Sequence, residues 1–363
     1  MLLTQLETPA LACDRKKFLE NIEIMKTMLE GKTLKLRPHF KSNKCAAIAR
    51  LQIEKGGAKG ITCAKLSEAM DLADAGIEDI LIANQIVEPA KIAKAAELAK
   101  CCHLTVCIDS AENAQGFSKA AVNAGSTVYC YVELDIGMKR CGARSEDEFV
   151  EIAKVVNSLP NLEFSGIQAY AGNIAHMKSR ADRETLMDEF HDRLRALIAH
   201  LAKEGIAVKE ISGGSTGSSV LKAQKGLYTE LQAGSYIFLD STYGKVEELP
   251  FRHSLFVLAT VISVHAGGRF ETILDAGVKA LGSDQDLPEV YTMDGKHLSG
   301  DIEVNEEHMK FYSDYDPQLK LGEKVLIIPG HCCSTVNLYD KLYFFEDGKI
   351  TGRTPVSARG CSR

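Results

Sequence analysis

The sequence contains no tryptophan, no long apolar run and no block of basic residues. Its apolar runs are short, such as 325–328, whereas a membrane-spanning helix needs about 20 apolar residues. We therefore expect no membrane span and no membrane partner. The net charge of −6 and the lack of an arginine-rich arm argue against a nucleic acid partner. The stretch from Met1 to Glu7 lacks the basic start and apolar run of a signal peptide.

The 11 cysteines are an odd number and are scattered over 363 residues. This distribution is typical of a reducing compartment rather than of a disulfide-bonded secreted domain, so we expect a cytoplasmic protein. Hydrophobic residues make up 45% of the chain and charged residues 25%, which is ordinary for a globular protein. A TIM barrel of about 250 residues would leave roughly a hundred for a second unit.

Short apolar segments alternate with helical patterns over the first two-thirds of the chain. Eight strands alternating with helices predict an α/β fold, a (β/α)8 TIM barrel, over residues 8–240. A doubly wound open sheet is the alternative, but its phosphate turn usually follows the first strand, and here the glycine-rich turn lies near the end. The predicted strands are 34–41, 60–64, 80–83, 104–109, 128–135, 164–170, 208–212 and 231–239. The predicted helices are 15–29, 44–55, 66–75, 89–99, 111–124, 145–157 and 183–204.

Beyond about residue 240 the pattern changes to strands separated by turns. The segments 256–264, 272–275, 325–328 and 341–345 are strand-like, and the spacers between them are rich in Gly and Asp. This pattern predicts a second, mostly β C-terminal domain, formed by residues 241–363 together with residues 1–7.

The stretch from Leu34 to Lys44 predicts a strand that ends near Lys41. In an extended segment His39 and Lys41 point to the same side. A lysine at the mouth of a barrel can form a Schiff base with a carbonyl compound or an aldehyde cofactor. The alternative is an ordinary surface lysine in a basic patch, and this stretch alone does not decide between the two.

Two further loops are candidates for binding an anionic ligand. The turn 211–218 is rich in Gly, Ser and Thr and follows the seventh predicted strand. TIM barrels often bind phosphate after strands 7 and 8, which favours a phosphate site over a flexible loop. The loop 135–142 carries glycines on both sides of Arg140 and would present that side chain at the barrel mouth, although an ordinary loop has the same composition.

A histidine and two cysteines, His331, Cys332 and Cys333, follow a strand of the predicted β domain. In an extended backbone His331 and Cys333 project to the same face, where an imidazole and a thiolate could bind zinc. The alternative is a buried cysteine pair beside a structural histidine. The isolated histidines, His176 among them, are expected to be structural.

These motifs, taken together and in this order, resemble the family of D-threonine aldolases and D-serine dehydratases, which are fold-type III pyridoxal phosphate enzymes related to alanine racemase. The resemblance extends over nearly the whole chain, and the combination is far more specific than any one motif. It is carried by Thr8-Pro9, Arg37-Pro38-His39-x-Lys41-x-x-Lys44, Asp135-x-Gly137-Met138-x-Arg140-x-Gly142, Ser212-Gly213-Gly214-Ser215-Thr216, the run from Glu230 to Tyr236, Asp275-Ala276-Gly277-x-Lys279-Ala280, Glu306-Glu307-His308 and Pro329-x-His331-x-Cys333.

The resemblance implies a small-molecule D-amino acid substrate, pyridoxal 5'-phosphate and a divalent metal as cofactors, and a homodimer with active sites near the subunit interface. It implies that Lys41 holds the cofactor. It assigns the cofactor phosphate to Gly213, Gly214, Ser215 and Thr216, the phenolic oxygen to Arg140, the ring to Tyr170, the pyridine nitrogen to Gln232, and the metal to His331 and Cys333. Racemase-type relatives have arginine where Gln232 stands, which leaves the protonation of the ring open.

Cys333 decides between the activities that the resemblance implies. Aldolase members resemble His-x-Asp at the metal positions, whereas dehydratase members resemble His-x-Cys. A thiolate favours zinc, with manganese as the alternative, over magnesium or calcium. We therefore expect elimination of water from a D-3-hydroxy amino acid of the D-serine or 3-hydroxyaspartate type, giving a 2-oxo acid and ammonia, with Lys41 removing the Cα proton. The alternatives are an aldolase that gives glycine and an aldehyde, and a non-catalytic protein that binds pyridoxal phosphate.

Overall fold

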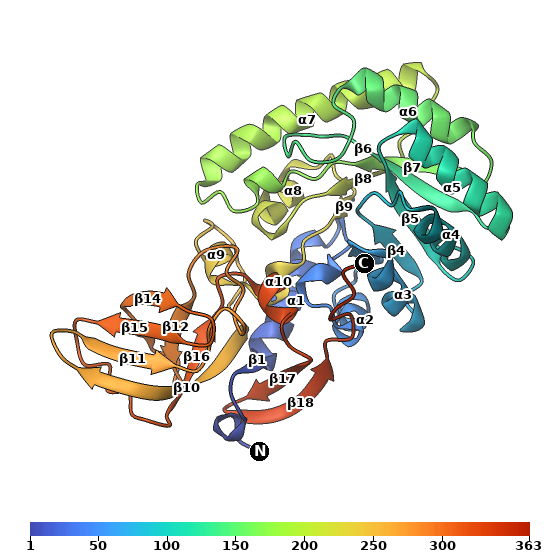
Figure 1. Ribbon diagram of the computed structural model, residues 1–363. Helices are drawn as coiled ribbons and strands as arrows, with labels where there is room; N and C mark the ends of the chain where they lie inside the picture. The colour runs from blue at the N-terminus through green and yellow to red at the C-terminus, as the bar shows by residue number, and fades with distance from the viewer.

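Eight short parallel strands form a curled sheet in the computed structural model, which describes residues 1–363 (Figure 1). The order is β2-β9-β8-β7-β6-β5-β4-β3, and a parallel bridge between His39 and Thr62 joins the two ends. The predicted (β/α)8 barrel is therefore confirmed. Its strands are β2 (Lys35–Leu36), β3 (Ile61–Cys63), β4 (Asp79–Ile82), β5 (His103–Ile108), β6 (Val128–Glu133), β7 (Leu162–Gln168), β8 (Glu210–Gly213) and β9 (Glu230–Leu231).

Helices alternate with these strands and begin at residues that cap them. The Asp14 carboxylate accepts from the Lys17 N–H at 3.1 Å, and Ser110 and Ser145 cap two later helices in the same way. The apolar side of each helix faces the strands, since positions three and four residues apart share a face. The helices are α1 (Arg15–Leu29), α2 (Ala46–Glu54), α3 (Leu66–Asp74), α4 (Pro89–Leu98), α5 (Ala111–Ala124), α6 (Glu146–Ser158), α7 (Arg180–Lys203) and α8 (Ser219–Lys225), with the short α9 (Ser241–Gly244) and α10 (Cys332–Val336) beyond them.

Two predicted strands are shorter than expected, and both corrections concern the barrel mouth. Strand β2 ends at Leu36, so Lys41 lies in a 3-10 turn, η2 (Phe40–Ser42), instead of at a strand end. Pro38 follows the strand and cannot donate to a ladder. Strand β9 ends at Leu231, and the chain then forms the turn η5 (Ser235–Ile237). At Gly234 this segment passes so close to the Lys41 turn that a Cβ would collide with Ser42.

The second sheet is mostly antiparallel and forms the β domain. Its central order is β13-β12-β16-β10-β1-β17-β18, with β11, β15 and β14 paired beyond β10. Strand β1 (Ala10–Asp14) belongs to this sheet because it pairs with β10 and with β17. The division into a barrel of residues 8–240 and a β domain of residues 241–363 with 1–7 remains a proposal, and in the structure residues 10–14 pair with strands of the β sheet. The remaining strands are β10 (Leu255–Ala266), β11 (Phe270–Leu274), β12 (Glu289–Thr292), β13 (His297–Leu298), β14 (Asp301–Val304), β15 (Met309–Ser313), β16 (Lys324–Ile328), β17 (Lys341–Glu346) and β18 (Lys349–Pro355).

A continuous core joins the barrel to the β domain. One cluster of 85 buried hydrophobic residues includes Leu36 of the barrel and Val257 of the β domain. Figure 1 shows α10 lying where the two parts meet. The two parts are therefore packed together, and a site can form between them. None of the helices combines the length and the apolar character that crossing a membrane would require.

Candidate active site

The Lys41 turn opens on the barrel mouth. The Lys41 side chain is exposed, and its Nζ lies 5.8 Å from the centre of the Tyr170 ring. The guanidinium carbon of Arg140 lies 5.7 Å from the same ring centre. His39 is buried beside them, and its Nδ1 accepts from the Lys41 N–H at 3.4 Å. Burial, together with the charges of Lys41 and Arg140, lowers the pKa of His39 well below its ordinary value, so the ring is neutral and able to accept.

The loop that carries Arg140 is shaped by its glycines and by Asp135. Gly137 has a φ of 131° and Gly142 a φ of 101°, a backbone conformation that favours glycine. One oxygen of the Asp135 carboxylate accepts from the N–H groups of Gly137 and Lys139, each at 3.0 Å. These contacts hold the turn that presents Arg140 to Tyr170.

The glycine-rich turn after β8 forms a cradle next to Tyr170. Gly214 has a φ of 85°, and a Cβ at Gly213 would collide with the carbonyl oxygen of Ala169. Ser215 and Thr216 are buried, and the Thr216 hydroxyl has no hydrogen-bond partner. Buried hydroxyls almost always have a partner, so this one is left for a ligand. The unpartnered Thr216 hydroxyl, in a turn rich in Gly and Ser, fits a contact with the phosphate of pyridoxal phosphate.

Gln232 lies beside this cradle, inside the barrel. Its Nε2 donates to the Gln168 Oε1 at 2.7 Å and to the Ser212 hydroxyl at 2.9 Å. Its backbone N–H donates to the Gly213 carbonyl at 2.9 Å. The amide is therefore fixed next to the glycine-rich turn. Gly213 of this turn lies against Ala169, which precedes Tyr170 in the chain.

His331 and Cys333 meet, although not in the extended geometry that the sequence predicted. Only His331 is extended, and it serves as the N-cap of α10, so Cys333 lies in a helical turn. The Cys333 Sγ lies 3.3 Å from the Ser42 Oγ, next to Lys41. The Asp284 carboxylate lies 2.7 Å from the His331 Nδ1. Because Asp284 occupies Nδ1, the other nitrogen, Nε2, is left to face Cys333 or a metal.

The electrostatics of this pair favour a thiolate. Contacts with the Cys332 thiol, His331 and Lys41 outweigh burial and lower the pKa of Cys333 well below its ordinary value. Burial disfavours a charged His331, but Cys333 and Asp284 raise the pKa of His331 to about 10. No third His, Cys, Asp or Glu completes a three-ligand cluster. One imidazole and one thiolate fit a zinc-preferring site whose other positions water or substrate would occupy.

His176 is the residue that sequence reasoning missed. It follows η3 (Gly172–Ile174), and its ring centre lies 6.5 Å from that of His331 and 4.6 Å from that of Tyr243. Burial lowers the pKa of His176 against the opposing charge of Asp240, so the ring is neutral near pH 7. No motif surrounds it in the sequence. Only the folding of the loop after β7 against the β domain brings it to the site.

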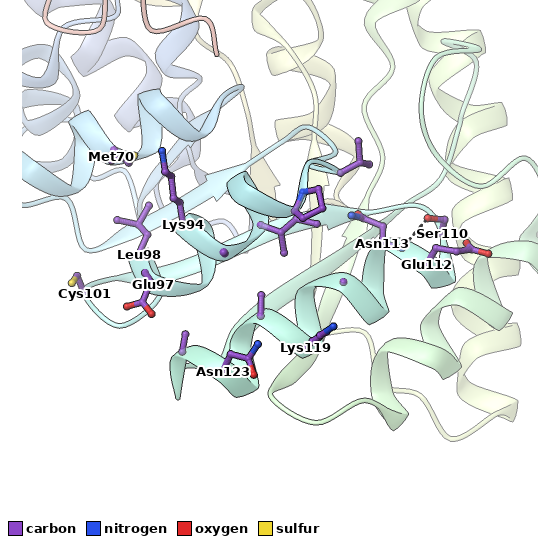
Figure 2. A pocket seen from close by; sticks show the side chains of 17 residues that line it. Met70, Lys94, Glu97, Leu98, Cys101, Ser110, Glu112, Asn113, Lys119 and Asn123 are labelled. Carbon is purple, nitrogen blue, oxygen red and sulfur yellow. Dashed lines mark hydrogen bonds between the residues drawn. The ribbon is translucent and has the colours of Figure 1, made fainter.

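A second depression lies on the outside of the barrel and is separate from this site. It is a groove of about 1130 Å³ between α4 and α5. Figure 2 shows Lys94 and Glu97 of α4 on one side and Lys119 and Asn123 of α5 on the other. None of the residues predicted for the cofactor or the metal lines it. The groove is therefore no part of the candidate active site.

Comparisons with known proteins agree with this geometry. Residues 13–242 match the family described as alanine racemase, N-terminal domain, and residues 254–345 match a serine dehydratase domain. A D-threonine aldolase from Arthrobacter sp is 39% identical, over 99% of this chain and 95% of its own. A 3-hydroxy-D-aspartate aldolase from Paracoccus denitrificans is 37% identical, over 98% of this chain and 93% of its own.

Dehydratases and a solved aldolase structure complete the comparison. A D-threo-3-hydroxyaspartate dehydratase from Delftia sp. is 26% identical, over 92% of each chain. The crystal structure of a D-threonine aldolase from Filomicrobium marinum has a TM-score of 0.94 at 34% identity and covers 100% of this chain and 99% of its own. The chain therefore belongs to the alanine racemase-like, fold-type III family of pyridoxal phosphate-dependent lyases that includes the D-threonine aldolases and the 3-hydroxyaspartate aldolases and dehydratases.

Proposed function

We propose that this protein is an aldolase that cleaves a D-3-hydroxy amino acid into glycine and an aldehyde. The proposal depends on one observation: the Lys41 turn contacts Cys333, and His331 and His176 lie beside that contact. The site therefore combines a lysine for the cofactor with side chains that can act on the β-hydroxyl of the substrate. The aldolases are 39% and 37% identical to this chain and the dehydratase 26%. This ranking favours the aldolase over the dehydratase that Cys333 led us to expect.

Lys41, the phosphate cradle and Gln232 are the residues that would hold pyridoxal 5'-phosphate. When bound, the cofactor supplies an electron sink for the electrons left at Cα. Lys41 is the amine nearest the Tyr170 ring and is the group placed to return a proton to Cα. The Arg140 guanidinium carbon lies 5.7 Å from the centre of the Tyr170 ring, where it would add a positive charge next to the cofactor.

Cleavage of the Cα–Cβ bond requires that the β-hydroxyl lose its proton. His176 is the base that we assign to this step, because its lowered pKa keeps it neutral at the pH of the cell. Tyr243 packs against the His176 ring edge to face and fixes its orientation. A base that is already neutral suits an aldolase better than a dehydratase, whose leaving hydroxide needs a proton instead.

His331 and Cys333 would hold a divalent metal, with zinc first and manganese second among the expected ions. A metal held there would supply Lewis acidity at the β-oxygen of the substrate. The chain contributes the orientation of these ligands, since Asp284 holds the His331 ring and Ser42 and Ser235 contact the Cys333 sulfur. Removal of metal with a chelator is expected to abolish activity and its return to restore it.

The dehydratase remains the second candidate, and Cys333 is the observation that favours it. The homodimer and the cytoplasmic location also remain predictions.

The reverse reaction separates the aldolase from the dehydratase. An aldolase incubated with glycine and acetaldehyde forms a 3-hydroxy amino acid, which chiral chromatography detects. A protein that forms none, but releases ammonia from D-serine, is a dehydratase, and one that does neither with bound cofactor is a non-catalytic binding protein.

A further inference from the structure

A buried lysine without an anionic partner lies next to the glycine-rich turn 213–216. Lys222 belongs to α8 and is only 2% exposed. Burial lowers the pKa of its amine well below the ordinary value, and no neighbouring carboxylate offsets that effect. Lysine side chains are almost never buried this deeply unless they are paired. Packing alone therefore does not account for a lysine at this position.

The Lys222 side chain packs directly against Gly214 and ends over an aromatic ring. A Cβ added at Gly214 would come within 2.7 Å of the Lys222 Cδ and 2.8 Å of its Cε. The Lys222 Nζ lies 2.9 Å from the centre of the Tyr228 ring, whose face attracts a cation. The Tyr228 hydroxyl in turn donates to the Ala169 carbonyl at 2.9 Å. These contacts hold the amine beside the glycine-rich turn.

The other titratable side chain packed on Tyr228 is His191 of α7, and it supplies no charge. The two ring centres lie 5.7 Å apart. Burial and then the charge of Lys222 lower the pKa of His191 to about 4, so its ring is neutral near pH 7. Its buried Nε2 has no hydrogen-bond partner. Lys222 is therefore the side chain of this cluster that can bring a positive charge to the turn.

The glycine-rich turn itself carries no charged side chain. Residues 211–218 contain no lysine and no arginine, and Lys222 is the next basic residue in the chain. The unpartnered Thr216 hydroxyl is a neutral donor. A phosphate monoester carries a charge of about −1.5 to −2 at pH 7, and an anion beside a buried amine favours the charged form of that amine. Lys222 would therefore supply the positive charge that the turn lacks.

We propose that Lys222 is a countercharge for the cofactor phosphate, placed against the glycine-rich turn, and that it makes the site select a phosphorylated cofactor over the unphosphorylated one. The inference rests on the part of the proposed function that gives the phosphate to residues 213–216. It is independent of the choice between aldolase and dehydratase. Lys222 is a positioning residue, because it contacts Gly214 and takes no part in the bonds that change.

Titration with two aldehydes tests the inference without any substrate. Pyridoxal phosphate and pyridoxal both form an imine with a lysine, and only the first carries a phosphate. The absorbance of the imine gives a dissociation constant for each aldehyde with the cofactor-free protein. The ratio of the constant for pyridoxal to that for pyridoxal phosphate is expected to fall at least about tenfold in Lys222→Met, because one partner of a buried charge pair is lost. Methionine keeps the unbranched shape of the lysine stem and fills the same space.

Lys225→Met is the matched control for this titration. Lys225 lies on the same helix and is paired with Asp188 at 2.6 Å, so that variant is expected to keep the ratio of the unchanged protein. A ratio in Lys222→Met equal to that of the unchanged protein overturns the inference. An equal fall of the ratio in both variants also overturns it.

The stability of the cofactor-free protein gives a second readout. Lys222→Met removes an unpaired buried amine and is expected to raise Tm without the cofactor, and to reduce the further rise in Tm that pyridoxal phosphate causes. A less stable variant with an unchanged ratio would make Lys222 a packing residue and overturn the inference while leaving the proposed function intact. If the unchanged protein forms no imine with pyridoxal phosphate, the cofactor assignment in the proposed function falls, and this inference falls with it.

Discussion

The Sγ of Cys333 lies 3.3 Å from the Oγ of Ser42, although 291 positions separate the two residues in the chain. One belongs to the β domain and the other to the turn of Lys41. This contact brings a candidate metal ligand next to the candidate cofactor lysine. Through this contact the barrel and the β domain, which have separate sheets, both contribute residues to one site.

Replacing Lys41 tests the attachment of the cofactor. Lys41→Ala is expected to remove the absorbance of bound cofactor and to abolish activity, since no other amine lies as close to Tyr170. Absorbance of the purified protein after incubation with pyridoxal phosphate measures this. Lys35→Ala removes an exposed lysine on β2 and should leave both unchanged. A fully active Lys41→Ala protein would contradict the assignment of Lys41 as the residue that holds the cofactor.

Cys333 is predicted to govern metal content. Cys333→Ala should weaken metal binding by about 100-fold or more, because it removes one of two protein ligands. Cys333→Asp should retain a metal and shift preference from zinc towards manganese, because a carboxylate is the harder ligand. Metal analysis after dialysis measures both. Cys332→Ser keeps a hydrogen-bond donor beside Cys333 and serves as the control, and an equal loss of metal in that variant would argue against a specific role for Cys333.

The lowered pKa of His176 predicts how the reaction depends on pH. Its pKa lies below the ordinary 6.5, so the neutral, accepting form predominates above that pH. Activity should therefore fall on the acid side with a midpoint below 6.5. His176→Gln should lower kcat by about 10²–10⁴-fold, the usual contribution of a general base, and flatten the acid limb. An unchanged pH profile in His176→Gln would remove His176 from the mechanism.

The floor of the barrel contains a charge network that should govern stability. Arg37 is buried and contacts Glu230 at 3.0 Å and Asp79 at 2.7 Å, and Lys59 contacts Glu230 at 2.8 Å. Glu230→Gln removes one of the two carboxylates that pair with the buried Arg37 and leaves only Asp79, so it should lower the free energy of unfolding by up to about 3–5 kcal/mol. Glu163→Gln removes the partner of an exposed pair with Lys209 and should cost less than about 1 kcal/mol.

The same network predicts the direction in which acid changes the free energy of unfolding. Burial opposes ionisation of Glu230, but Arg37 and Lys59 outweigh it and hold the pKa below the ordinary 4.5. A carboxylate with a lowered pKa stabilises the fold above its unfolded pKa and loses that effect as the pH falls through the folded pKa. The difference between the unchanged protein and Glu230→Gln should therefore shrink below about pH 4.5. Denaturant unfolding at several pH values measures it, and a difference that grows in acid would contradict the network.

The sequence predicted the barrel well because its signals are local. Helices 15–29 and 111–124 have the predicted bounds, since a cap begins each one and an apolar period continues it. The glycine turn at 213–216 was found for the same reason. The pairing of β1 with β10 and β17 is long-range, and nothing within residues 10–14 reveals it.

The choice of reaction could not be read from one position. Cys333 alone favoured a dehydratase, whereas similarity along the whole chain favours an aldolase. His176 had no local signal, because its role depends on its distance from His331, 155 positions later. The identity of one candidate metal ligand is therefore weaker evidence for the reaction than the residues that the fold places around that ligand.

Product analysis with D-threonine, by NMR of the complete reaction mixture, tests the central claim most directly. The account predicts glycine and acetaldehyde in equal amounts, no ammonia, and loss of both products on removal of metal. Ammonia and 2-oxobutanoate in place of glycine and acetaldehyde would contradict it and establish a dehydratase.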